Sequence, residues 1–109
     1  MKCARESRKL RAMKIMIMTD MEGVAGVLNH DDWVHPHSRF YAQGLRLLTA
    51  EVSAAVAGFY AGGAREIVVI DGHGAGGIDP ELLDPRAQLM RGWGAEVYPL
   101  WTFALFAPV

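Results

Sequence analysis

The chain has a single cysteine, Cys3, so no disulfide can form within it, which fits a reducing compartment such as the cytoplasm. No apolar run reaches the roughly 18 residues that a membrane-spanning helix requires, and we therefore expect no membrane partner. A net charge of −1 gives no general attraction to nucleic acid. With 109 residues, 51% of them apolar, the chain is predicted to form at most one globular domain.

The two ends differ from the body of the chain. Residues 1–12 carry five of the eleven basic residues and one of the twelve acidic residues, which leaves residues 13–109 with a net charge of −5. We interpret residues 1–12 as a disordered basic leader. Residues 97–109 contain no charge. As a free end they would expose an aggregation-prone patch, so we expect the chain to be a truncated or frame-shifted piece of a longer protein.

The hydrophobic pattern of the body predicts an α/β fold. Residues 14–19 and 66–70 are apolar runs without alternation, as in parallel strands covered on both faces. Between them, helical spacing of apolar residues predicts a helix over 38–60, capped by Ser38 and closed by glycines. Its apolar stripe is predicted to contain Leu45, Leu48, Val52, Ala55, Val56 and Phe59. Residues 29–37 read as a loop, 80–83 as a helical turn, and 87–91 as a third strand.

A strand, a helix and a strand form a βαβ unit, in which ligands bind outside the carboxyl ends of the strands. Asp20 and Glu22 follow the first strand, and their spacing puts both carboxylates on one face of an extended segment. His73 follows the second strand, between two glycines. If the strands are parallel neighbours, these three side chains converge, and two carboxylates with an imidazole suit a divalent transition metal, above all zinc.

Asp71 can serve this site in either of two ways. It can orient His73 or the loop around it, because metal-bound imidazoles usually donate their second N–H to a carboxylate or carbonyl. It can equally cap the turn. Residues 72–77 also satisfy the G-x-G-x-x-G pattern of dinucleotide-binding folds, but the pattern follows the second strand and no long helix is predicted after it.

Histidines and aspartates also gather between the first strand and the long helix. These residues are His30, Asp31, Asp32, His35 and His37. An extended His35-x-His37 pair can bind a metal, but we interpret the segment as a solvated loop. Trp33 and Tyr41 are expected to pack, and Glu51 to lie on the solvated face of the helix.

The order of these motifs resembles the opening of the D-aminopeptidase (DppA-like) family of zinc metallopeptidases. The resemblance rests on residues 13–27, Trp33, Tyr41, 46–52 and 62–74, and it fades after residue 92. It implies an α/β fold in which residues 13–96 form the N-terminal part of the family domain. It implies that Asp20, Glu22 and His73 are zinc ligands, with Asp20 bridging two ions. It also implies hydrolysis of short peptides or amides with an N-terminal D-amino acid, by an enzyme that forms homo-oligomers.

The resemblance also implies parts that this chain lacks. The family is longer, and its second half supplies a histidine, a glutamate and a proposed catalytic cysteine, so no nucleophile is assigned here. We expect the chain to ligate at most one zinc ion largely by itself, in a parallel sheet truncated relative to the family fold. Two other hypotheses stay open: a non-catalytic metal-binding remnant or subunit fragment, and a dinucleotide-binding Rossmann-type module.

Overall fold

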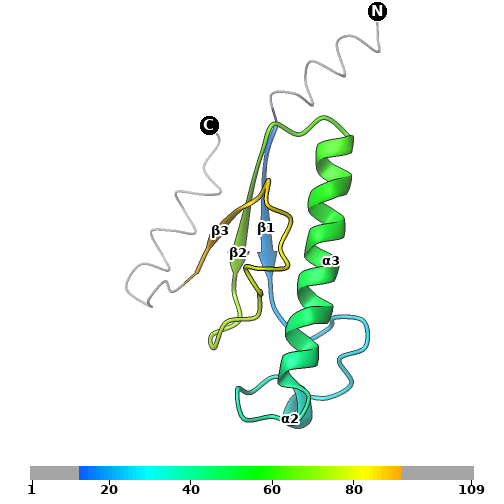
Figure 1. Ribbon diagram of the computed structural model, residues 1–109, viewed down its shortest axis with the longest axis vertical. Coiled ribbons are helices and arrows are strands. Elements are labelled where there is room, and N and C mark those ends of the chain that lie inside the picture. The colour runs from blue at the N-terminus through cyan, green and yellow to red at the C-terminus, as the bar shows by residue number, and fades with distance from the viewer. Residues whose placement is uncertain (1–12, 92–109) are drawn as a thin grey trace, which may run out of the picture.

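The computed structural model describes residues 13–91, and the sequence predictions for the leader and for residues 97–109 lie outside this range. Its elements are β1 (Lys14–Thr19), α2 (His30–Trp33), α3 (Tyr41–Ala61), β2 (Glu66–Asp71) and β3 (Gln88–Met90) (Figure 1). The strands form a three-stranded sheet in the order β1-β2-β3, and both neighbouring pairs are parallel. The predicted α/β class with a parallel sheet is therefore confirmed.

The β1-α3-β2 unit positions the carboxyl ends of the first two strands. In Figure 1, α3 lies beside the sheet and connects the end of the loop after β1 to the start of β2. The strand register pairs Lys14 with Glu66 at the start and Thr19 with Asp71 at the end. The Thr19 hydroxyl donates to the carbonyl of Ile70 at 2.8 Å. Both strands therefore stop at the same level, and the segments that follow them leave the sheet together.

The core lies where α3 packs on the sheet. Ile67 and Val69 of β2 are fully buried and pack with Leu48, Val52 and Val56 of the helix. Their spacing follows the period of two in the strand and the 3.6-residue period in the helix. The predicted stripe is correct except at Phe59, which is 43% exposed.

The strand β1 is less covered than its sequence predicts. Met18 is 45% exposed, and Ile15, Met16 and Ile17 are only half-buried. Among the described residues β1 is an edge strand, hydrogen-bonded only to β2, and α3 is the long helix beside it. The expectation of cover on both faces is therefore wrong for β1 within residues 13–91, whereas the last three residues of β2 are buried.

The N-terminal end of α3 differs from the prediction, whereas the C-terminal end agrees with it. The helix begins at Tyr41, after an N-cap Phe40 that makes no side-chain capping bond. The Ser38 hydroxyl instead donates to the Asp31 carbonyl at 2.7 Å, so the predicted cap is wrong because this side chain ties the loop back to α2. At the other end, Gly63 adopts a φ of 101°, a left-handed conformation that glycine tolerates.

A short helix replaces part of the predicted loop over 29–37. The Asn29 side chain accepts a hydrogen bond from the Asp32 N–H at 2.9 Å and caps α2. Trp33, 5% exposed, anchors this helix in the core, as its predicted packing role requires. Residues 80–83 form the predicted single turn, in which the N–H groups of Leu82 and Leu83 both donate to the Asp79 carbonyl at 3.1 Å. Across residues 13–91, no helix combines the length and apolar character that crossing a membrane requires.

Candidate metal centre

The structure brings the two carboxylates and the imidazole together at the carboxyl ends of β1 and β2. The Nδ1 atom of His73 lies 3.1 Å from Oδ1 of Asp20 and 3.9 Å from Oε2 of Glu22. The three side chains offer one ligand atom each, and all three atoms lie within 4.8 Å of one another. The predicted convergence is therefore confirmed as geometry, and it follows from the shared end point of the two strands.

The buried side chain between the two carboxylates explains why both face outward. Met21 is fully buried, whereas the side chains of Asp20 and Glu22 are 60% and 46% exposed. The segment predicted to be extended is instead a bend at Met21 followed by a turn at Glu22, and this shape puts Met21 in the core and leaves the two carboxylates outside. A side chain at Gly44 of α3 would meet the Met21 sulfur, so glycine at this position permits the close approach that seats Met21.

The ring of His73 is fixed by a backbone carbonyl. Its Nε2 atom lies 2.7 Å from the carbonyl oxygen of Val34, the residue that closes α2. A carbonyl oxygen only accepts hydrogen bonds, so Nε2 carries the hydrogen and donates it. This bond leaves Nδ1 directed at the carboxylates, which is the arrangement that imidazole ligands adopt in metal sites. The His73 side chain is only 10% exposed.

Asp71 combines its two predicted roles, because its contacts cap the turn and also reach the backbone of His73. It is 3% exposed, and its carboxylate accepts hydrogen bonds from the N–H groups of Gly77 and Ile78 at 2.9–3.0 Å. It also accepts a longer bond, 3.3 Å, from the backbone N–H of His73. Asp71 therefore holds the loop over 72–78 in shape and positions His73 through the backbone.

The same contacts argue against the dinucleotide hypothesis. The backbone N–H groups of Gly77 and Ile78, at the end of the G-x-G-x-x-G pattern, are bound to the Asp71 carboxylate. A pyrophosphate requires such N–H groups at the start of a helix. Within residues 13–91 no helix follows this loop. The pattern is explained by the tight turn, in which Gly76 has a φ of 91°.

The environment of Asp20 favours its charged form. Partial burial raises the pKa of this carboxyl, but the hydrogen bond from the Met21 N–H and the close side chains of Glu22 and His73 outweigh burial and hold the pKa below its ordinary value. The opposite holds for Tyr41, where burial and the nearby charge of Asp71 raise the pKa of the phenol. The Tyr41 hydroxyl donates to the Gly76 carbonyl and fastens the loop to α3.

The spacing of the donor atoms suits a tetrahedral ion. Ligand atoms at 2.0–2.2 Å from a zinc ion in tetrahedral geometry lie about 3.3–3.6 Å apart. The two separations at His73, 3.1 and 3.9 Å, lie on either side of that range, so sub-ångström adjustments of exposed carboxylates would satisfy it. The residues present therefore fit a zinc ion with three protein ligands and an open position.

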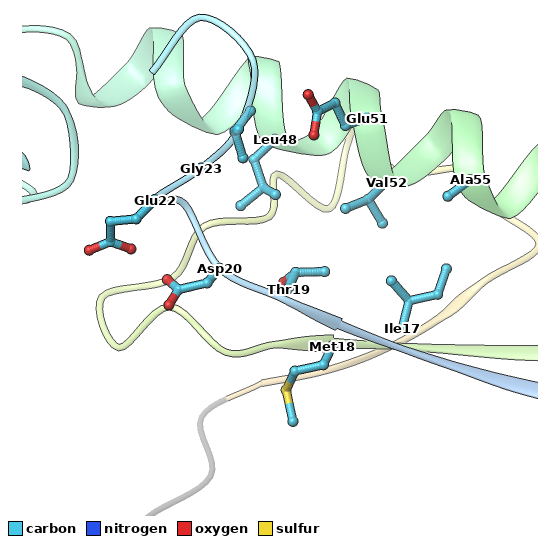
Figure 2. A pocket seen from close by; sticks show the side chains of 11 residues that line it. Ile17, Met18, Thr19, Asp20, Glu22, Gly23, Leu48, Glu51, Val52 and Ala55 are labelled. Atoms are coloured by element: carbon cyan, nitrogen blue, oxygen red, sulfur yellow. The ribbon is translucent and has the colours of Figure 1, made fainter. Parts of the chain in front are cut away.

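A hollow beside the carboxylates runs between β1 and α3. Figure 2 shows Asp20 and Glu22 at one end of it, with Leu48, Val52 and Glu51 of the helix opposite the strand. Glu51 is exposed, as predicted, but it also accepts a hydrogen bond from the Ala25 N–H at 2.9 Å. It thereby holds the segment after the D-x-E motif against α3.

Sequence reasoning missed two groups that shape the site. One is the Val34 carbonyl, since a backbone acceptor carries no residue-type signal. The other is Thr49, fully buried, whose hydroxyl donates to Leu45 and accepts from the Asp79 N–H at 2.9 Å. A threonine on the apolar face of a predicted helix is the signal that marks such a bridge.

Comparison with known proteins identifies the family of the chain. A family model described as D-aminopeptidase matches residues 13–100. The curated D-aminopeptidase of Bacillus subtilis (strain 168) is 33% identical over 81 residues, which make up 73% of this chain and 29% of that relative. The chain therefore spans less than a third of the length of the curated relative that it matches. No solved structure matches the chain significantly. On these matches, the chain belongs to the D-aminopeptidase family.

Proposed function

We propose that the protein is a zinc-dependent aminopeptidase that hydrolyses short peptides or amides with an N-terminal D-amino acid. Membership of the D-aminopeptidase family supports the reaction class. One observation supports the metal dependence: Nδ1 of His73, the ring nitrogen that Val34 does not engage, lies 3.1 Å from the Asp20 carboxylate. We also propose that hydrolysis uses two metal ions, as the family resemblance implies. The same resemblance implies that the full-length enzyme is a homo-oligomer.

The argument from His73 follows from its hydrogen bonds. Because Nε2 donates to Val34, a neutral ring presents a lone pair at Nδ1. That lone pair points at the negative oxygens of Asp20 and Glu22, and two electron-rich groups repel at this distance. A positive centre between them removes the repulsion. A zinc ion is one such centre, and a proton on Nδ1 is the competing one.

The three side chains would contribute differently to binding a cation. Asp20 and Glu22 supply two negative charges, and His73 supplies a neutral nitrogen whose direction is set by Val34. A zinc ion bound there would polarise an amide carbonyl and lower the pKa of a bound water toward about 7. The loop held by Asp71 keeps the imidazole in place, so less ordering is needed when the ion binds.

The hollow supports binding of a peptide by its N-terminus. Its wall is apolar at Ile17, Leu48 and Val52, which suits an uncharged side chain. Its lining also includes the carboxylates of Asp20, Glu22 and Glu51, which attract an α-ammonium group. A cationic amine next to an apolar side chain is the chemistry of a free amino-terminal residue.

The test is hydrolysis of a D-alanyl amide by the zinc-loaded 109-residue chain, with the L-alanyl amide as the matched substrate. We expect release of D-alanine that a chelator stops and added zinc restores. Turnover of the L-amide at the same rate would contradict the stereochemical part of the proposal. Folded chain with bound zinc and no turnover of either amide would contradict the proposed activity for this chain and favour the non-catalytic metal-binding remnant.

A further inference from the structure

We propose that His30, Asp31 and His35 form a second site for a divalent transition-metal ion, separate from the site at His73. Nδ1 of His30 lies 3.2 Å from Nε2 of His35 and 3.5 Å from Oδ1 of Asp31. The three donor atoms all lie within 4.8 Å of one another. The ion would be one that accepts imidazole and carboxylate together, and zinc and copper(II) are the main candidates.

The distances carry the proposal. Two ligand atoms of a tetrahedral zinc lie about 3.3–3.6 Å apart when each is 2.0–2.2 Å from the ion. The separations at His30, 3.2 and 3.5 Å, match that range closely. Two imidazoles and one carboxylate are also the ligand set of open zinc sites, in which water fills the remaining position. His30 and Asp31 are exposed and His35 is half-buried, which leaves room for that water.

The elements that carry the two histidines hold them in place. His30 begins α2, whose first turn is capped by Asn29. The backbone N–H of His35 donates to the Ser38 hydroxyl at 3.1 Å, which fixes the turn after the helix. The His35 ring stacks on the ring of His37, with 5.3 Å between the ring centres and 6° between their planes. The segment read from sequence as a solvated loop is therefore an ordered frame that aims two ring nitrogens at one point.

The carboxylate of Glu22 lies near the ring of His30, on the side opposite the proposed ion. Binding through Nδ1 leaves the hydrogen of His30 on Nε2, which lies 3.8 Å from Oε1 of Glu22. The other carboxylate oxygen of Glu22 lies 3.9 Å from Nδ1 of His73. Glu22 thus stands between the two sites, and a carboxylate behind a ligating imidazole strengthens that ligand. The second site uses none of the three proposed ligands of the first as its own ligand, so variants of His35 and of His73 test the two sites separately.

Zinc content of the full 109-residue chain tests the proposal, measured by equilibrium dialysis and elemental mass spectrometry. We expect His30→Gln and His35→Ala each to lose one equivalent of zinc relative to the wild type. The matched control is Asp32→Asn, which removes a charge from the same helix but not from the cluster and should keep the full content. Unchanged zinc in both His30→Gln and His35→Ala would overturn the proposal.

A background variant separates this site from the proposed catalytic one. In His73→Ala, the zinc that His35→Ala removes should remain bound, whether or not the first site holds an ion. If zinc in the wild type is lost in His73→Ala and nothing further is lost in the double variant His35→Ala with His73→Ala, the second site does not exist.

A variant at an exposed position separates loss of zinc binding from loss of folding. The Asp31 side chain is 99% exposed, so Asp31→Asn leaves the packing unchanged. We expect it to weaken zinc binding at this site about tenfold or more, with an unchanged circular dichroism spectrum. Cobalt(II) should give a visible absorption band of tetrahedral intensity in the His73→Ala background. Absence of that band, together with wild-type affinity in Asp31→Asn, would contradict the proposed ligand set.

Discussion

The imidazole of His73 donates from Nε2 to the carbonyl of Val34 at 2.7 Å, across 39 positions of sequence. Val34 closes the short helix α2, which is anchored in the core by Trp33. The orientation of the proposed zinc ligand therefore depends on a helix that contributes no ligand to that site. This link explains how the segment between β1 and α3 can act on the metal centre from outside it.

The glycine before His73 should be irreplaceable, and the glycine after it should not. A Cβ atom at residue 72 would collide with the Thr19 carbonyl oxygen, which accepts the Gly72 N–H at 3.0 Å. A Cβ atom at residue 74 meets nothing within 4 Å. We expect Gly72→Ala to lower the free energy of unfolding by about 1–3 kcal/mol, because the ends of β1 and β2 must separate. Urea unfolding of both variants checks this, and equal losses would contradict it.

Removing the charge of Asp71 should loosen the loop that carries His73. In Asp71→Asn the amide nitrogen would face N–H donors at Gly77 or Ile78, so at least one backbone donor loses its acceptor. We expect a loss of about 1–3 kcal/mol in the free energy of unfolding. The exposed Asp31→Asn is the matched control and should leave stability within about 0.5 kcal/mol of the wild type. Wild-type stability of Asp71→Asn would show that the carboxylate does not hold the loop.

Acid should remove the contribution of Asp84 to stability. Hydrogen bonds from the Arg86 side chain and backbone lower the pKa of Asp84 to about 2. A carboxyl whose pKa is lower in the folded than in the unfolded chain stabilises the fold above the unfolded value, near 3.9, and this contribution disappears as the pH falls through about 2. The stability difference between wild type and Asp84→Asn should therefore be constant above pH 5 and shrink between pH 4 and 2. Chemical unfolding across that pH range checks it, and a constant difference would contradict the ion pair.

The sequence was sufficient to predict the β1-α3-β2 frame, because its patterns are local and strong. Apolar runs of β-branched residues and methionine marked both strands, and glycine marked the end of α3. The convergence at the metal centre followed from the parallel pairing of β1 and β2 alone, since Asp20 and His73 leave the same edge of the sheet.

Features that depend on tertiary partners were not predictable. The cover on β1 depends on what packs against each face, which periodicity does not report. Ser38 was assigned to a cap by residue type, whereas its hydroxyl is used by the Asp31 carbonyl. The short α2 was not predicted, because Pro36 and the polar residues around it favour a loop. The roles of Val34 and Thr49 rest on backbone groups and burial, which a single sequence does not display.

The central claim is that Asp20, Glu22 and His73 hold a zinc ion. The most direct test is the zinc content of the purified chain by elemental mass spectrometry, beside Asp20→Ala and His73→Ala. Each variant should lose one equivalent of zinc, and Asp20→Ala should keep the unfolding transition of the wild type, because the Asp20 side chain is 60% exposed. A folded chain whose zinc content is the same in the wild type and both variants would show that Asp20 and His73 do not hold a zinc ion.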